Sequence, residues 1–277
     1  MRIVVTGSNG RIGRYVVREL SHAHSVTGFD RSPEALDGAQ HIAGDICDLE
    51  QCKRAFDDAE VVVHLAAIPG PEGDGMNVMR TNVIGAYAVH QAAIACGVRR
   101  VVSASTISIY GFAFRHRDFN PEYFPIDIAH PVKPQDHYAI SKEATESIAA
   151  AFHRGHRLQT IVLRPSGAIL VEPSMRRRPV EDVQPDERWG MWSYSDLRDL
   201  ARMFRAAAEA AGIEHGIFNA VAEDNIAGVP TMELIARFWP GIPVRREIPG
   251  DDALYQWSEM RTALGFEPQY TLRRLYA

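Results

Sequence analysis

The stretch that decides the fold opens the sequence and reads Met1-Arg-Ile-Val-Val-Thr-Gly-Ser-Asn-Gly-Arg-Ile-Gly13. Its β-branched run predicts a strand, its glycines predict a tight turn, and the amphipathic run Tyr15–Leu20 predicts a helix. A strand, a glycine turn and a helix in this order favour a dinucleotide-binding loop over an ordinary connection in which glycines only relieve crowding. Gly7 would form the turn, Gly10 would let the backbone approach a diphosphate, and Gly13 would let the helix pack closely on the strand. The free N–H groups at the helix start attract anionic phosphate.

The following segments alternate between strand-like and helix-like patterns. Further strands are expected at 25–30, 41–45, 61–67, 99–105 and 159–164, and helices at about 48–56, 76–96 and 138–153. The run Val61–Ala67 is apolar without alternation, which is typical of a strand covered on both faces of a parallel sheet. This order predicts the α/β class, with a doubly wound, Rossmann-type parallel sheet and right-handed crossovers.

The pattern weakens beyond Pro165. We therefore expect a dinucleotide-binding Rossmann domain over 1–165 and a small C-terminal substrate lobe over 166–277, with about 195–222 returning to the Rossmann sheet. A polar, basic loop is expected at 173–190 and contains the run Arg176–Arg178. These arginines either bind a carboxylate or phosphate or form a solvated loop.

Length and composition exclude several classes of protein. The chain has 277 residues, 46% of them hydrophobic, and a formal net charge of −5, which gives no support for a nucleic-acid or anionic-membrane partner. No segment has the apolar length of a membrane span, and because strand signal begins at residue 2 we expect no secretion signal. Cys47, Cys52 and Cys96 lack metal-site spacing, so we expect reduced thiols, no metal site and a cytoplasmic protein.

Two acidic residues follow predicted strands. Asp30 stands roughly 20 residues after the glycine loop, where a carboxylate accepts hydrogen bonds from an adenosine ribose and disfavours a 2′-phosphate. This favours NAD, although the neighbouring Arg31 could receive that phosphate and keeps NADP open. Asp45 could accept from the adenine amino group or be a solvated loop acid.

The most informative pair is Tyr138 and Lys142, four residues apart on a predicted helix and therefore on one face. A nearby ammonium favours the phenolate and brings the phenol toward catalytic range, and the same ammonium can bind a cofactor ribose. The alternative is a surface pair that stabilises the helix. With nine tyrosines and three lysines, chance gives roughly 0.1 such pairs. Upstream, the hydroxyl-rich segment 101–111 ends a predicted strand, where ligands bind in open α/β sheets.

Six ordered motifs resemble the extended short-chain dehydrogenase/reductases, and within them the NAD-dependent epimerase/dehydratase family. They are Thr6-Gly-x-x-Gly-x-x-Gly13, His64-Leu-Ala-Ala67, Asn82-Val-x-Gly85, Ser105-Thr106 with Tyr110-Gly111, Tyr138-x-x-x-Lys142 and Leu163-Arg-Pro165. The resemblance covers residues 1–165 closely and the remainder loosely.

This resemblance implies roles for single residues. Tyr138 would be the catalytic acid/base, Lys142 its activator and ribose ligand, and Thr106 the assisting hydroxyl. The cofactor would contact Gly7, Asn9, Gly10, Arg11, Ile12, Gly13, Asp30, Arg31, Asp45, Ile46, Leu65, Ala66, Ala67, Asn82, Tyr138, Lys142 and Pro165. The substrate would contact Ile68, Ser105, Thr106 and Ser166. The resemblance also implies a homodimer, formed by pairing the helices at 76–96 and 138–153 into a four-helix bundle.

The expected function is NAD-dependent hydride transfer at a secondary alcohol of a sugar, by a dehydrogenase or an epimerase. The run Arg164-Pro-Ser-Gly-Ala-Ile-Leu-Val171 departs from the pattern of sugar-nucleotide members, and Trp192-Ser-Tyr-Ser-Asp196 is more similar to uronate dehydrogenases. A dehydratase is least expected, because Ile107-Ser108 stand where dehydratases carry Asp-Glu. A non-catalytic dinucleotide sensor is the alternative of another class, which the intact Tyr138/Lys142 pair disfavours.

Overall fold

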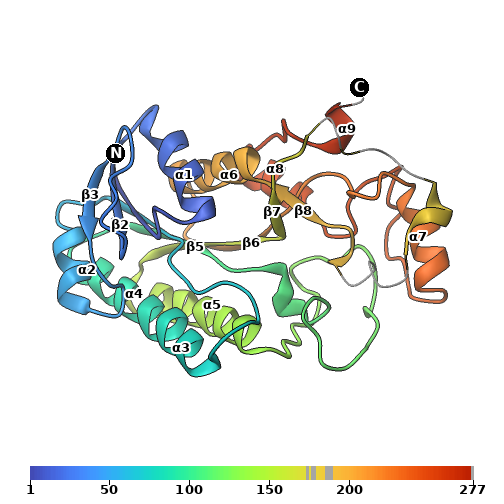
Figure 1. Ribbon diagram of the computed structural model, residues 1–277, viewed down its shortest axis with the longest axis horizontal. Coiled ribbons are helices and arrows are strands. Elements are labelled where there is room, and N and C mark those ends of the chain that lie inside the picture. Colours follow the sequence, from blue (N-terminus) through green and yellow to red (C-terminus); the bar gives the residue numbers. More distant parts are fainter. Residues whose placement is uncertain (173–174, 176–178, 185–189, 276–277) are drawn as a thin grey trace. The chain divides into compact units, whose positions relative to one another are not determined.

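The computed structural model describes residues 1–172, 175, 179–184 and 190–275 (Figure 1). Its centre is a seven-stranded sheet in the order β3-β2-β1-β4-β5-β6-β9. The strands are β1 (Arg2–Thr6), β2 (Ser25–Asp30), β3 (Gln40–Ala43), β4 (Val61–His64), β5 (Arg100–Ala104), β6 (Gln159–Pro165) and β9 (His215–Ala220). Neighbouring strands from β3 to β6 pair in parallel. This order confirms the doubly wound, Rossmann-type fold.

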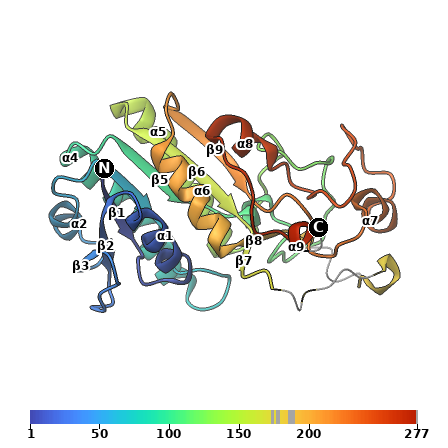
Figure 2. The same cartoon turned by 90° about the horizontal axis from the view of Figure 1, so that it is seen from above.

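Helices cover both faces of this sheet. They are α1 (Arg11–Ser21), α2 (Leu49–Ala55), α3 (Gly75–Met79), α4 (Gly85–Ala95), α5 (His137–His156) and α6 (Leu197–Glu209). In Figure 1, α1 and α6 lie on one face and α2 to α5 on the other, and Figure 2 shows α1 and α6 in front of the strands. The strand Val61–His64 is buried throughout, as its unbroken apolar pattern predicts.

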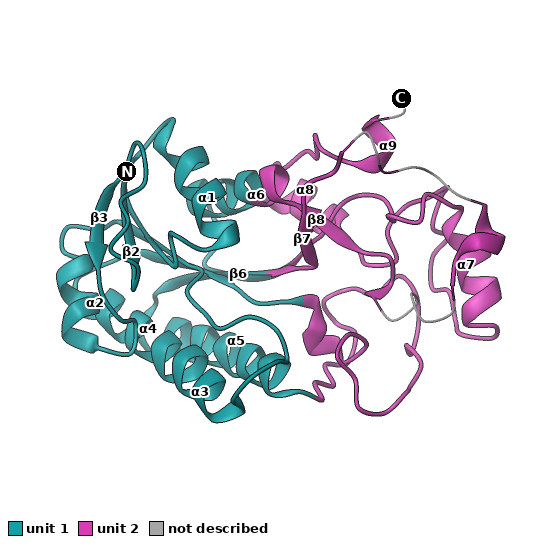
Figure 3. Cartoon of the chain, in the orientation of Figure 1, with its two compact units in different colours: residues 1–106, 136–163, 201–217 teal, residues 107–135, 164–200, 218–277 magenta. Residues whose placement is uncertain are grey.

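The structure divides into two compact units, shown in different colours in Figure 3. The first comprises 1–106, 136–163 and 201–217, and the second 107–135, 164–200 and 218–277. The chain passes from the first unit to the second between Leu163 and Arg164, close to the domain boundary that the sequence predicts at residue 165. The strand β9 falls within the segment expected to return to the sheet and stands at its edge.

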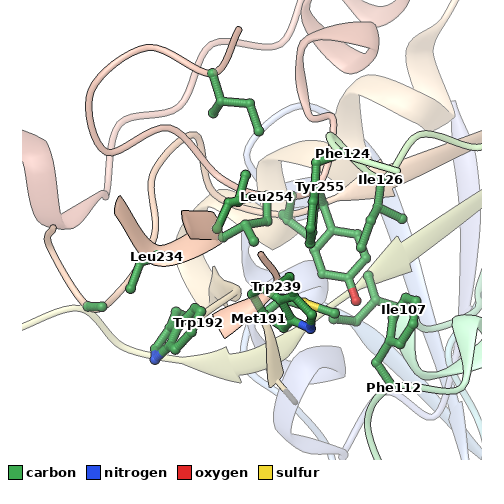
Figure 4. Close-up of a cluster of buried hydrophobic side chains, with 14 of the residues drawn as sticks. Ile107, Phe112, Phe124, Ile126, Met191, Trp192, Leu234, Trp239, Leu254 and Tyr255 are labelled. Carbon is green, nitrogen blue, oxygen red and sulfur yellow. The ribbon is translucent and has the colours of Figure 1, made fainter. Parts of the chain in front are cut away.

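The second unit has its own aromatic core. Phe112, Phe124 and Ile126 of the 107–135 segment pack with Trp239 and Tyr255 from the last third of the chain (Figure 4). These five side chains bury large apolar areas, which explains why an insertion in the first half of the sequence joins the C-terminal unit. The remaining elements are the 3₁₀ turns η2 (Ile107–Tyr110) and η3 (Val180–Asp182), the strands β7 (Gly167–Ile169) and β8 (Tyr194–Asp196), and the helices α7 (Thr231–Phe238), α8 (Ser258–Leu264) and α9 (Leu272–Leu275).

One expected helix differs in detail. The continuous helix predicted for 76–96 is divided by a π-helical turn, η1 (Arg80–Ile84), between α3 and α4. Such turns are rare and are frequent at functional sites. Among the described residues, no helix is both long and apolar enough to cross a membrane.

Candidate active site

The glycine turn leaves no space for side chains. Gly7 has φ +69°, and a Cβ added there would lie 2.6 Å from the backbone nitrogen of Ala66. A Cβ on Gly13 would lie 2.1 Å from the carbonyl oxygen of Gly7. Gly10 is the N-cap of α1 and makes no side-chain cap hydrogen bond. The turn is therefore a bare backbone cradle at a helix N-terminus, which fits the diphosphate of a dinucleotide.

A cavity of about 340 Å³ opens beside this turn. It is lined by ten of the predicted cofactor residues: Gly7, Asn9, Gly10, Asp30, Arg31, Asp45, Ile46, Leu65, Ala66 and Ala67. Sequence reasoning missed five further lining residues, namely Arg14, Phe29, Ser32, Gly44 and Thr81. Arg14 and Ser32 could have been found, because one follows the glycine loop by a single residue and the other follows Asp30 by two. Of the other predicted cofactor residues, Arg11, Ile12, Gly13, Asn82, Tyr138, Lys142 and Pro165 do not line this cavity.

The two predicted acidic residues are oriented by backbone donors. The Asp30 carboxylate accepts hydrogen bonds from the N–H groups of Asn9 at 3.0 Å and Ser32 at 2.9 Å. One Asp45 oxygen accepts from the N–H of Cys47 at 2.9 Å. Charge-assisted bonds of this kind fix a carboxylate in place. Both acids are therefore held at the cavity wall with a defined orientation.

The glycine loop is also tied to the segment after β4. The Thr6 hydroxyl shares a 2.8 Å hydrogen bond with Nδ1 of His64 and accepts from the N–H of Ala66 at 3.3 Å. Burial holds the pKa of His64 well below its usual value, so its ring is neutral. A neutral ring keeps an additional positive charge out of this part of the site.

Asn82, which the family resemblance places among the cofactor residues, connects the loop after β4 to α5. It lies in the π-helical turn η1, where its Oδ1 accepts from the N–H of Ile68 at 2.8 Å and its Nδ2 donates to the carbonyl oxygen of Ile68 at 3.0 Å. Nδ2 also donates to Ser141 Oγ of α5 at 2.9 Å. The amide thus braces the loop after β4 against α5 through hydrogen bonds to Ile68 and Ser141. Ile68 is held by its backbone in this brace.

The predicted pair, Tyr138 and Lys142, lies at the start of α5. Asp136 caps this helix by accepting from the N–H of Ala139 at 2.9 Å. The Tyr138 side chain is hydrogen-bonded to the side chain of Thr106, which follows β5. Lys142 Nζ donates to the carbonyl oxygen of Ala104 at 2.8 Å and lies 5.9 Å from the centroid of the Tyr138 ring. Thr106, from a distant segment of the sequence, therefore meets Tyr138 and Lys142 beyond the carboxyl end of β5.

Burial dominates the electrostatics of this couple. It lowers the pKa of Lys142 to about 8, although the Glu146 carboxylate opposes the fall. It raises the pKa of Tyr138 to about 12, and the hydrogen bond from Thr106 offsets only part of the rise. The sequence led us to expect a lowered pKa for the Tyr138 phenol, and the structure gives a raised one. Burial of the phenol raises its pKa, and the nearby Lys142 ammonium donates to the carbonyl oxygen of Ala104 and not to the phenol.

The predicted substrate residues are spread over both units. Ser105 Oγ donates to Glu146 Oε1 at 2.5 Å, so its hydroxyl is engaged by α5. Ser166 belongs to the second unit, where its N–H donates to Ser195 Oγ at 3.0 Å and its hydroxyl donates to the carbonyl oxygen of Ser193 at 2.9 Å. Arg176–Arg178 lie outside the described residues. No group of three potential metal-ligating side chains occurs in the part of the chain that the structure describes.

Comparison with known proteins gives the family. The chain is 31% identical over 216 residues to the L-arabinose 1-dehydrogenase (NAD(P)(+)) of Haloferax volcanii, covering 76% of this chain and 83% of that protein. It is 22% identical over 227 residues to the uronate dehydrogenase of Pseudomonas syringae pv. tomato, covering 80% and 75% of the two chains. A short-chain dehydrogenase/reductase superfamily protein from Agrobacterium tumefaciens, solved with bound NAD, superposes with a TM-score of 0.75 at 25% identity, covering 99% and 94%. The sequence profile of the NAD dependent epimerase/dehydratase family matches residues 3–220, and the chain belongs to this family of NAD-dependent enzymes.

Proposed function

We propose that the protein is an NAD-dependent dehydrogenase that oxidises a secondary alcohol of a free sugar or sugar acid. The observation that carries the proposal is the meeting of Thr106, Tyr138 and Lys142 beyond β5, in the same unit as the glycine-loop cavity. A binding protein has no need of a buried lysine beneath a tyrosine, whereas a proton-transfer site does.

The cofactor site is assigned from the residues that fit it. NAD supplies, when bound, the carbon that accepts the hydride. The glycine turn and the N-terminus of α1 would hold its diphosphate, and Asp30 would accept hydrogen bonds from its adenosine ribose. Two N–H bonds of the Lys142 ammonium have no partner among the described residues, and they are available to the hydroxyls of the second ribose.

Tyr138 would carry the proton. In oxidation, the phenolate oxygen of Tyr138 would take the hydroxyl proton as the carbinol carbon gives up its hydride, and in reduction the phenol would return the proton. Thr106, hydrogen-bonded to this phenol, would hold the substrate oxygen beside it. A phenol with a pKa of about 12 is protonated at neutral pH, so we expect oxidation to accelerate as the pH rises, up to the pH near 8 at which Lys142 loses its proton and the rate falls off.

The relatives that match over three quarters or more of this chain favour a sugar without a nucleotide. The names of three of them specify L-arabinose, glucose 6-phosphate or uronate as the compound that is dehydrogenated. A uronate is the specific alternative that the segment Trp192–Asp196 favours. The test measures NADH formation with aldoses, aldose phosphates, uronates and UDP-sugars in parallel, with NADP as the alternative acceptor. Turnover of UDP-sugars alone, without net NADH, would replace the dehydrogenase with an epimerase.

We also propose that the protein is a homodimer. Large apolar side chains are exposed on the helices that the family resemblance assigns to an interface: Met76, Ile84, Tyr87 and Ile140. Met76 is 77% exposed and Tyr87 51%. Apolar side chains gathered on neighbouring helices are a common feature of interfaces. Light scattering coupled to gel filtration tests this, and a monomer at micromolar concentration would contradict it.

A further inference from the structure

Helix α5 bears a third polar residue on the face that carries the proposed couple. Tyr138, Lys142 and Glu146 recur at intervals of four residues, so their side chains lie on one side of the helix. That side meets the end of β5, where three consecutive residues, 104–106, each bind one of the three. The contacts form a regular attachment of the helix to the strand end.

Glu146 is the part of this attachment that the proposed mechanism does not use. It is only 7% exposed, and its Oε1 accepts a 2.5 Å hydrogen bond from Ser105 Oγ. A buried carboxylate is costly unless charge and hydrogen bonds compensate it. Its negative charge raises the pKa of Lys142 against the effect of burial. The buried carboxylate therefore favours the charged form of Lys142.

The other titratable groups near the ammonium do not replace this charge. Lys142 faces Glu146 and Tyr138 from its own helix and His64 from β4. His64 and His90 of α4 remain neutral, because burial holds both of their pKa values low, that of His90 at about 4. Tyr138 is protonated at neutral pH. Glu146 is thus the anion that acts on Lys142 among the described residues.

We propose that Glu146 is a positioning residue: its buried carboxylate keeps the Lys142 ammonium charged and, through Ser105, holds α5 in register with the end of β5. This inference rests on the proposed function for the part that Lys142 takes in catalysis. The effect of Glu146 on the protonation of Lys142, however, can be measured without substrate or cofactor.

The test is an NMR titration of ¹³Cε-labelled lysine in the full chain. The protein has only three lysines, so Lys142 is assigned by substitution while Lys53 and Lys133 serve as references. In the parent protein, we expect the Lys142 signal to titrate near pH 8. In Glu146→Gln, which keeps the shape but removes the charge, the midpoint should fall by at least about one pH unit, a tenfold loss of proton affinity.

The matched control is Glu143→Gln on the exposed face of the same helix. It removes the same charge from α5 and should move the Lys142 midpoint by less than about 0.3 pH units, because solvent screens exposed charges. An equal shift in both variants, or no shift in Glu146→Gln, would overturn the proposal. If Glu146→Gln does not fold, Glu146→Asp decides: its shortened side chain should lower the midpoint measurably, and an unchanged midpoint would overturn the proposal.

The pH profile of kcat tests whether the Glu146 charge also affects catalysis. In Glu146→Gln, the alkaline limb of the pH profile of kcat should move down by the same interval as the Lys142 midpoint, while Glu143→Gln should keep the parent profile. If the parent protein neither binds NAD nor turns over sugars, the proposed function fails while the NMR result still decides the role of Glu146. A Lys142 midpoint that moves without any change in the kcat profile would refute the catalytic part of the inference.

Discussion

Replacing Lys142 by methionine should make the folded protein more stable while it abolishes hydride transfer. Burial lowers the pKa of Lys142 from its ordinary value of 10.5 to about 8. Each pKa unit corresponds to about 1.4 kcal/mol, so keeping this proton bound at pH 7 costs the folded state about 3 kcal/mol. Methionine has a similar length and carries no charge. Its substitution forfeits the hydrogen bond to Ala104, a loss of about 1 kcal/mol, which leaves a net gain of about 2 kcal/mol.

The sign of the pH dependence makes this prediction specific. Because the pKa is lower in the folded protein than in the unfolded chain, the unfolded chain binds more protons between pH 8 and 10.5. The stability of the parent protein at this site therefore rises through that interval. At pH 9.5 the cost of the lysine has fallen to about 1 kcal/mol, and the parent and the variant should be nearly equal in stability.

Urea unfolding followed by tryptophan fluorescence at pH 7 and pH 9.5 measures both quantities. Lys53→Met is the control, because Lys53 pairs with Glu50 on the surface and should change the free energy of unfolding by less than about 1 kcal/mol at either pH. The reasoning is refuted if Lys142→Met is less stable than the parent at pH 7. It is also refuted if the difference between the two proteins is the same at both pH values.

Three further substitutions test the site. Tyr138→Phe should lower kcat by at least about 100-fold and leave NAD affinity within about twofold, since it removes only the proton carrier. Undiminished turnover would exclude Tyr138 as the acid/base, and no turnover by the parent protein would favour a dinucleotide sensor. Asp30→Ala should weaken NAD binding by about tenfold, as expected for a lost bond to a charged group, and tighter binding of NADP than NAD by the parent would contradict the assigned cofactor. Gly13→Ala should abolish NAD binding and lower Tm, because the new Cβ would lie 2.1 Å from the Gly7 carbonyl oxygen; wild-type affinity in this variant would contradict the packing described here.

The parts of the site that could be predicted are those whose chemistry lies within one short segment. Gly7 and Gly10 are constrained by their own turn, and Asp30 stands at the end of its own strand, so local patterns place all three beside the cavity. The helical spacing of Tyr138 and Lys142 likewise depends on one element. Parallel strands then bring these segments to the same edge of the sheet, which the alternation of elements already indicates.

The parts that could not be predicted depend on partners distant in the sequence. Asn82 carries a familiar motif, but its amide is directed by Ile68 and Ser141, and the π-helical turn that allows this has no periodic signature. The raised pKa of Tyr138 follows from how deeply α5 packs, which spacing does not reveal. The bond of Ser105 to a glutamate 41 residues away is likewise invisible in the sequence, where its hydroxyl is one of several at the end of a predicted strand.

The choice of lysine at position 142 follows from the same packing. The chain has 30 basic residues of the Lys and Arg types, and only three are lysines. Lys53 and Lys133 pair with exposed glutamates, where an arginine would serve as well. Lys142 is instead buried and donates to one backbone carbonyl, and in the proposed function its remaining donors bind a cofactor ribose. A planar guanidinium with five donors would need more partners than this position offers, and it could not release its proton, so the site requires the compact, titratable ammonium that the rest of the chain rarely uses.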